Sequence, residues 1–187
     1  MLVIDCCIRG ELSTTRRYYQ AYLEASGKTD VQILELSAIG LAPLDFATLQ
    51  KRDALCAKKQ FDHELFALAR QFQAAEEILI AAPYWDLSFP SLLKVYLEHI
   101  MVSGLTFGYQ EDGRCIGYCK AETLRYFSSC GGYCGQNHLG FAYVKALCAM
   151  VGIPHCVPYF LEGMDIDPSQ RENILEKAIQ GLSQENA

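Results

Sequence analysis

The chain has 187 residues, of which 51% are hydrophobic and 20% are charged, enough for a single domain with a full core. Its formal net charge of -6 argues against a nucleic-acid partner, because phosphate binding needs clustered Lys and Arg. No apolar run approaches the ~20 residues of a membrane helix and no basic signal-peptide start is present, so we expect a cytoplasmic protein without a membrane span, folded as one domain over residues 1–187.

The first apolar segment, residues 2–8, predicts a buried strand. A polar stretch, residues 9–15, follows it and leads into a helix. That helix is indicated by aromatic and apolar residues at helical spacing, Tyr18, Tyr19, Tyr22 and Leu23. Ser13 is a natural N-cap for it and Gly27 is a natural end. The chain therefore begins as strand, polar loop and helix.

Strands and helices alternate through the rest of the chain. Four further strands are predicted, at residues 31–36, 77–82, 122–129 and 155–160. Four further helices are predicted, at residues 61–72, 92–101, 139–151 and 174–182. Residues 39–45 are typical of a loop, and residues 106–119 of an excursion around the Asp112-Gly113 turn signal. This order predicts an α/β fold, a doubly wound sheet of five parallel strands with helices on both faces.

Ligands of such sheets bind beyond the carboxyl ends of the strands, so the loops that follow strands are the candidate site. Loop one (residues 9–15) carries three consecutive hydroxyls at a helix N-terminus, Ser13, Thr14 and Thr15. Hydroxyls, free backbone N–H groups and the helix dipole all favour a phosphate there, and Arg9 adds a cation. An ordinary N-cap explains Ser13 alone. The loop lacks the glycine patterns of dinucleotide and triphosphate sites, so a terminal monophosphate fits it better than a pyrophosphate.

Loop two and loop three follow the two central strands. Loop two (residues 83–87) consists of Pro83, Tyr84, Trp85, Asp86 and Leu87, and loop three (residues 129–132) consists of Ser129, Cys130, Gly131 and Gly132. The aromatic residues offer a stacking surface, and the two glycines let the backbone approach a planar ligand. The alternatives are aromatic residues that only cap the core and a glycine turn with no ligand. With the phosphate loop, the three loops describe a flavin mononucleotide (FMN) site.

Nine cysteines are present, and several lie in apolar segments where a reduced thiol behaves as a small hydrophobe. Two Cys-x-x-x-Cys pairs stand out, Cys115 with Cys119 and Cys130 with Cys134. This spacing permits a zinc or iron–sulfur site without being diagnostic of one. We assign no metal ligands and leave a redox or metal role of these four cysteines open.

The sequence resembles the FMN-dependent NAD(P)H:quinone oxidoreductases and azoreductases of the flavodoxin-2 family. The resemblance rests on Ser13-Thr14-Thr15, on Ala82-Pro83-Tyr84-Trp85-Asp86-Leu87 followed by Phe89-Pro90-Ser91-Leu92-Leu93-Lys94, on Gly104-Leu105-Thr106-Phe107-Gly108-Tyr109 and on Ser129-Cys130-Gly131-Gly132. It implies a flavodoxin-like fold with strand order 2-1-3-4-5. It also implies that loops two and three contact the isoalloxazine ring.

The chain departs from the family pattern in three places. Cys7 stands where azoreductases commonly carry serine, Cys130 stands where the glycine loop commonly holds Arg, and Trp85-Asp86 replaces a more usual Tyr-Asn pair. The resemblance still implies an FMN-binding enzyme, and the departures bear on its electron acceptor.

We therefore expect an FMN-dependent oxidoreductase that takes hydride from NADH or NADPH and passes two electrons to a quinone, azo or nitro compound. The flavin carries the chemistry, so no dedicated catalytic side chain is expected. The broad apolar surface of residues 92–101 and the aromatic residues of the 107–118 excursion predict a homodimer. The alternatives are a flavodoxin-type electron carrier and a thiol or metal redox protein.

Overall fold

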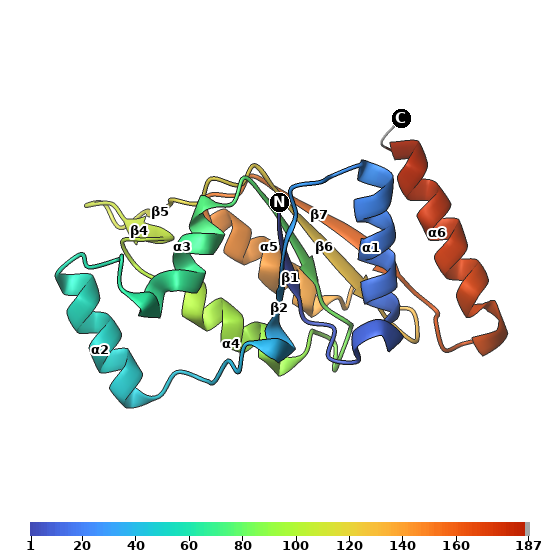
Figure 1. Cartoon of the computed structure of the whole chain (residues 1–187), viewed down its shortest axis with the longest axis horizontal. Coiled ribbons are helices and arrows are strands. Elements are labelled where there is room, and N and C mark those ends of the chain that lie inside the picture. The colour runs from blue at the N-terminus through green and yellow to red at the C-terminus, as the bar shows by residue number, and fades with distance from the viewer. Residues whose placement is uncertain (186–187) are drawn as a thin grey trace.

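The computed structural model describes residues 1–185, and side chains as far as Leu182. Five parallel strands form one sheet: β1 (Leu2–Asp5), β2 (Gln32–Glu35), β3 (Glu77–Ala81), β6 (Thr123–Ser129) and β7 (His155–Leu161). Their order across the sheet is β2-β1-β3-β6-β7, with β3 at the centre. In chain order these are strands 2-1-3-4-5, so the expected flavodoxin-like topology is confirmed (Figure 1).

Helices cover both faces of the sheet, as the continuous apolar strands require. On one face α1 (Thr14–Ser26) and α6 (Arg171–Glu185) lie side by side, and the core there includes Tyr19, Phe127 and Leu175. On the other face α3 (Ala67–Ala74), α4 (Ser91–Ile100) and α5 (Leu139–Val151) enclose a larger core. Figure 1 shows the sheet between these two groups of helices. No described helix is both long and apolar enough to cross a lipid bilayer.

The ends of α1 are those expected from the sequence. The Arg16 backbone N–H donates to the Ser13 hydroxyl oxygen at 3.4 Å, so Ser13 is the N-cap. Gly27 ends the helix with φ at 61°, a left-handed conformation that favours glycine. These caps fix the two ends of α1, whose first two residues, Thr14 and Thr15, belong to loop one.

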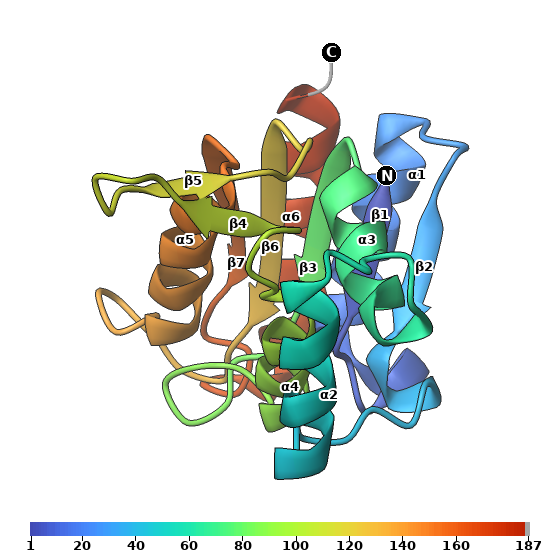
Figure 2. The same ribbon diagram turned by 90° about the vertical axis from the view of Figure 1, so that its left-hand side faces the viewer.

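One helix was not expected. Residues 46–57, left unassigned by the sequence pattern, form α2 (Phe46–Ala57), whose N-cap Asp45 accepts the Thr48 N–H at 2.7 Å. None of its residues is buried. Figures 1 and 2 show it at one end of the molecule, outside the sheet and the two groups of helices that cover it. The expected helix at 61–72 is shorter than predicted, because residues Glu64–Phe66 form a 3₁₀ turn before α3 begins at Ala67.

The excursion after α4 is an antiparallel hairpin of β4 (Phe107–Tyr109) and β5 (Cys115–Gly117), turned at Asp112-Gly113 as expected (Figure 2). Gly117 lies so close to the backbone of Val151 and Gly152 that no side chain fits there. The hairpin is therefore held against the end of α5.

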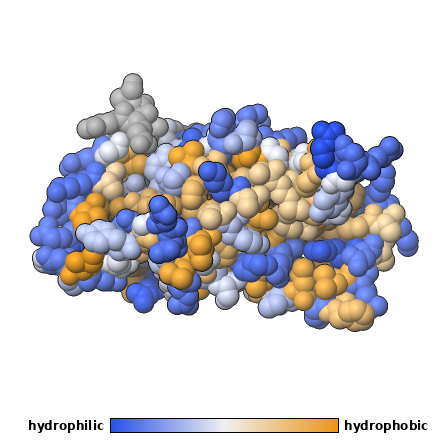
Figure 3. Space-filling view, turned by 180° about the vertical axis from the view of Figure 1, so that it is seen from behind, coloured by the Kyte–Doolittle hydropathy of each residue, from blue (hydrophilic) through white to orange (hydrophobic). Residues whose placement is uncertain are grey.

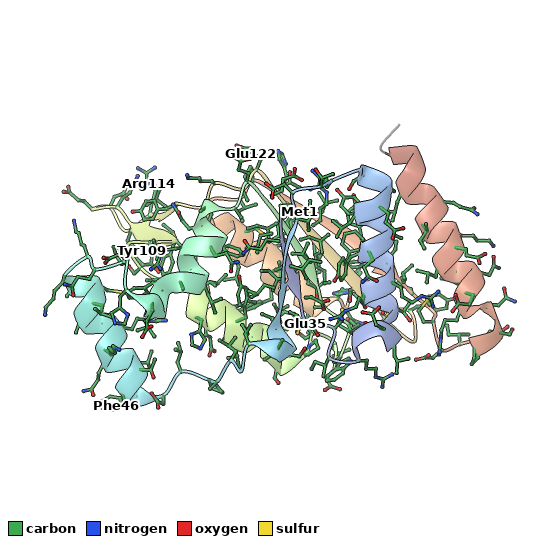
Figure 4. All side chains as sticks on the ribbon, in the orientation of Figure 1. Met1, Glu35, Phe46, Tyr109, Arg114 and Glu122 are labelled. Atoms are coloured by element: carbon green, nitrogen blue, oxygen red, sulfur yellow. The ribbon has the colours of Figure 1, made fainter. Side chains whose placement is uncertain are left out.

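A buried ion pair joins β1 to α1 beneath loop one. The Asp5 carboxylate accepts the Tyr19 hydroxyl and lies 2.8 Å from the Arg16 guanidinium, and both charged side chains are almost fully buried. Arg16 also pairs with Glu35, which Figure 4 labels at the end of β2. The Cys7 N–H donates to the second Asp5 oxygen at 2.7 Å. This network fixes the start of α1 against the carboxyl end of the sheet.

Candidate functional site

Loops one, two and three meet at the carboxyl edge of the sheet, where they enclose a cleft of about 220 Å³. The cleft brings together most of the residues predicted from the sequence: Arg9, Ser13, Thr14, Pro83, Tyr84, Trp85, Ser129, Cys130 and Gly131. The other predicted residues belong to the same three loops but do not line the cleft: Thr15, Asp86, Leu87 and Gly132. The cleft is smaller than a usual ligand pocket, so a large ligand would extend over its rim.

Loop one forms an anion-binding end of the cleft. In residues 1–185 the backbone N–H groups of Thr14 and Thr15, the first two helical residues, have no protein acceptor. The Arg9 side chain is exposed and forms no ion pair with the described residues. The N-terminus of α1, two free donors and an unpaired guanidinium therefore face one region, which is the arrangement that binds a phosphate group.

The Thr15 hydroxyl is not part of that anion-binding end. Thr15 is fully buried, and its hydroxyl oxygen lies 2.7 Å from the Ser129 hydroxyl. It therefore ties loop one to loop three, and the predicted run of three phosphate-facing hydroxyls is reduced to Ser13 and Thr14. The sequence could not show this, because the direction of Thr15 depends on the phase of α1 relative to the sheet.

Loop two is a tight turn with a strained backbone. Trp85 and Ser88 exchange backbone hydrogen bonds of 3.2 and 2.7 Å across Asp86 and Leu87. These two central residues have φ of 49° and 67°, which costs an L-residue about 1–2 kcal/mol. The Leu87 carbonyl accepts the Leu139 N–H at 3.0 Å, which anchors the turn to the start of α5. Strain of this kind concentrates at functional sites.

Loop three presents free backbone donors. The carbonyls of Cys130, Gly131 and Gly132 accept N–H groups from residues 163–165 at 2.8–3.1 Å. By contrast, in the described part of the chain no protein group accepts the N–H of Gly131 or Gly132. Neither glycine has positive φ, so backbone conformation is not the reason for them. A side chain at Gly131 would run into the Asp165 carboxylate, whereas Gly132 faces open space.

One wall of the cleft is formed by the segment after β7, which the sequence did not indicate as part of the site. Met164, Asp165 and Arg171 line the cleft, as do Ile8, directly before loop one, and Leu12 within it. Arg171 donates to the Met164 carbonyl at 3.0 Å and forms an ion pair with Asp165. The available signal was the position of this segment after the last strand, at the same sheet edge as the other three loops.

The four singled-out cysteines do not form one cluster. Cys130 and Cys134 have their sulfurs 2.8 Å apart, and the Glu162 carboxylate lies within 4.8 Å of both. Cys115 and Cys119 lie on and just after the hairpin, where their thiols donate to the Met150 and Thr106 carbonyls. Two identical spacings therefore lie in different surroundings, and only the second pair adjoins the cleft.

His138 is a structural residue beside the cleft. It caps α5 by accepting the Phe141 N–H at 3.2 Å, stacks on Phe160 at 4.0 Å and contacts the edge of Tyr84 at 5.0 Å. Burial among these rings lowers the pKa of His138 below its ordinary value of 6.5. The buried side chain is therefore neutral at pH 7.

This shift predicts a loss of stability in mild acid. The folded pKa is the lower one, so below pH ~6.5 the unfolded chain takes up a proton that the folded chain refuses. The contribution of neutral His138 to the free energy of unfolding is complete above that pH. It decreases as the pH falls toward the pKa of His138 in the folded state. We expect urea unfolding at about pH 7.5 and about pH 5.5 to differ less in His138→Asn, which keeps an N-cap side chain, than in the parent. Equal pH dependence in the two proteins would contradict the assignment.

The chain is similar to a known family and to known proteins. A family model described as a flavodoxin-like fold, Flavodoxin_2, matches residues 1–185. The chain is 33% identical over 124 residues to FMN-dependent NADH:quinone oxidoreductase 2 of Clostridium acetobutylicum, an alignment that covers 64% of this chain and 62% of that enzyme, less than two thirds of its length. It is 27% identical over 191 residues to FMN-dependent NADH:quinone oxidoreductase of Bacillus pumilus, covering 94% of this chain and 90% of that enzyme.

Solved structures confirm the fold. An FMN-dependent NADH-azoreductase from Bacillus anthracis, crystallised in complex with FMN, superimposes with a TM-score of 0.81 at 18% identity, covering 100% of this chain and 98% of that one. The family match over residues 1–185 confirms the resemblance derived from the loops. The chain belongs to the flavodoxin-like fold family Flavodoxin_2.

Proposed function

We propose that the protein is an FMN-dependent NAD(P)H oxidoreductase that delivers two electrons to a quinone, azo or nitro compound. The observation that carries this proposal is the pairing of free backbone donors across one cleft, which Thr14 lines on one side and Gly131 on the other. Each has a second free N–H in the next residue, Thr15 and Gly132. One set suits a phosphate and the other a heterocycle with acceptor atoms along its edge. Enzymes similar to this chain are named FMN-dependent NADH:quinone oxidoreductases.

The residues present fit FMN. The phosphate would lie at the start of α1, between the Thr14 and Thr15 N–H groups, the Ser13 and Thr14 hydroxyls and Arg9. The ring would extend over the rim of the cleft, where Tyr84 and the 42% exposed Trp85 offer aromatic surface. Its pyrimidine edge would meet loop three, with Asp86 and Leu87 shaping the turn beneath Trp85.

FMN, when bound, supplies a carrier that accepts hydride from a nicotinamide and passes on two electrons. The protein holds and orients it. The free N–H groups of Gly131 and Gly132 would stabilise negative charge on a ligand beside them, so no acid–base side chain would be needed there. His138 caps α5 through Nδ1 and is buried against the ring of Phe160, which favours a structural role for it.

The proposal is tested by reconstituting the protein with FMN and following NADH and NADPH oxidation with a benzoquinone or a sulfonated azo dye as acceptor. We expect one FMN per chain and turnover that requires both nucleotide and acceptor. The electron-carrier alternative is favoured only by the acidic net charge of -6. A protein that binds FMN and yet turns over only with a protein redox partner would establish that alternative.

We also propose that the enzyme works as a cytoplasmic homodimer. All nine cysteines are free, which suits a reducing compartment. Large apolar side chains remain exposed at the end of the molecule that carries α2 and the hairpin, where Figure 4 labels Phe46 and Tyr109. Apolar patches also interrupt the hydrophilic surface seen in Figure 3. The expected role of α4 is revised, because Leu93, Tyr96, Leu97 and Ile100 are covered within the chain.

In the proposed dimer, the partner subunit would cover the exposed rim of the cleft. Trp85 and Leu87 are 42% and 52% exposed at the point where the ring would lie, and a partner subunit would shield that surface. We expect sedimentation at micromolar concentration to give twice the 20.9 kDa mass of the chain. A 20.9 kDa species would contradict the dimer without touching the flavin assignment.

A further inference from the structure

Cys130 and Cys134 form a buried dithiol in the wall of the cleft. Their sulfurs are 2.8 Å apart, whereas the sulfurs of a disulfide are about 2.05 Å apart, so a small side-chain movement would join them. The Cys134 thiol donates to the Cys130 sulfur, and the Cys130 thiol donates to the Gly132 carbonyl at 3.0 Å. Each side chain is 6% exposed. The pair is therefore positioned to form a bond and is shielded from bulk solvent.

The backbone around the pair makes closure feasible. Only three residues separate the two cysteines, and two of them are Gly131 and Gly132. A side chain at Gly132 would meet nothing within 4 Å, so this part of the loop has room to move. The Cys134 N–H is held by the Glu162 carboxylate at 3.0 Å. The backbone of Cys130 is held by Leu161 and Met164, so both cysteines are anchored and the adaptable part of the loop lies between them, at Gly132.

The dithiol faces the cleft. Cys130 lines it directly between Ser129 and Gly131, and so does Tyr84, whose hydroxyl donates to the Asn137 carbonyl at 3.3 Å. Burial raises the pKa of Cys130 to about 12, so the thiol is protonated at neutral pH. A protonated, shielded thiol reacts slowly with oxidants in solution. An electron acceptor held in the cleft has far better access, and the Glu162 carboxylate is near enough to take a proton.

We propose that Cys130 and Cys134 are a dithiol–disulfide couple that exchanges two electrons with FMN bound in the adjoining cleft. The inference rests on the proposed function. In the oxidising direction two S–H bonds break and one S–S bond forms, and the two electrons and two protons released reduce FMN. In the other direction reduced FMN returns them, the S–S bond breaks and two thiols form. The disulfide and the oxidised flavin together can therefore accept four electrons per chain.

The test starts from FMN-loaded protein that has been oxidised with diamide and freed of the reagent. We expect seven reactive thiols after denaturation, nine minus the two joined in the disulfide. Anaerobic titration should then consume about two NADH per FMN and restore nine thiols, because each couple takes two electrons. Protein stripped of FMN should stay at seven thiols with NADH, which shows that the electrons pass through the flavin.

Matched variants assign the bond. Cys134→Ser should keep eight thiols, nine minus one, before and after diamide, and should take about one NADH per FMN. Cys115→Ser and Cys148→Ser should behave as the parent, losing two thiols and taking about two NADH. The second control is needed because Cys148 and Cys156 line one surface pocket and are another candidate pair. Cys130→Ser should reproduce Cys134→Ser, which separates the effect from any local defect at one position.

Three results would overturn the inference. Nine thiols after diamide in FMN-loaded protein would show that the pair does not close. If NADH reduces the flavin but the thiol count stays at seven, the disulfide does not exchange electrons with the flavin. Zinc retained on purification and lost in Cys134→Ser would make the thiols metal ligands together with Glu162. If NADH fails to reduce the flavin, the proposed function fails, and restoration of thiols by dithionite only when FMN is present would still support the couple.

Discussion

Replacing Arg9 and Thr14 together by alanine is expected to weaken FMN binding by about a hundredfold or more. Each side chain lines the anion-binding end of the cleft, and neither forms an ion pair within the described residues. Charge-assisted hydrogen bonds to phosphate contribute roughly 1.5–3 kcal/mol each, and two of them correspond to about two orders of magnitude in Kd. Fluorescence titration of the stripped protein with FMN measures the change.

The variant avoids Ser13 because that hydroxyl also caps α1, and its loss alone would cost about 1 kcal/mol of stability. Arg17→Ala is the matched control, since Arg17 lies on the same helix but pairs with Glu172 at the surface, away from the cleft. We expect this control to leave Kd unchanged. If the double variant binds FMN as tightly as the parent, the phosphate does not bind at loop one.

Asp5→Asn is expected to lower the free energy of unfolding by about 3 kcal/mol. The substitution leaves the buried Arg16 guanidinium without its buried counter-charge, and removing one partner of such a pair typically costs about 3–5 kcal/mol. Glu35 still contacts Arg16 at 3.1 Å from the surface, which places the effect at the lower end of that range. For a chain of this length the melting temperature should fall by about 6–12 °C.

Thermal and urea unfolding of the FMN-free protein measure this effect without interference from ligand binding. Asp112→Asn is the control, because it breaks an exposed ion pair with Arg114 on the hairpin and should change stability by less than about 1 kcal/mol. If both substitutions have the same small effect, the Asp5–Arg16 pair does not hold α1 against the sheet.

The sheet could be predicted because its strands carry the pattern that their burial requires. Residues 78–81 are apolar on both faces and are covered by helices on both sides, so one segment indicates both the strand and the layers. Helix α2 could not be found in the same way, since none of its residues is buried and only Leu55 and Cys56 pack against the core, near its end. Its one signal was Asp45, an N-cap residue whose role depends on a helix that nothing else indicated.

The site was predictable at the level of loops and less so at the level of side chains. The rule that strand ends share an edge located loops one, two and three correctly around one cleft. It does not say which way a side chain points, and so Thr15 was placed in the cleft although its hydroxyl bonds Ser129. The same rule, applied to the segment after the last strand, would have added Asp165 and Arg171.

The most direct test of the central claim is anaerobic mixing of the FMN-loaded protein with excess NADH in a stopped-flow spectrophotometer. The account predicts that the oxidised flavin absorbance disappears at a rate on the order of 10 per second or faster, typical of enzyme turnover, and far faster than with free FMN at the same concentration. A second mixing with a small quinone should restore it. Flavin that stays oxidised with NADH, or is reduced no faster than free FMN, would contradict the assignment of the cleft as the active site of a nicotinamide-dependent flavoenzyme.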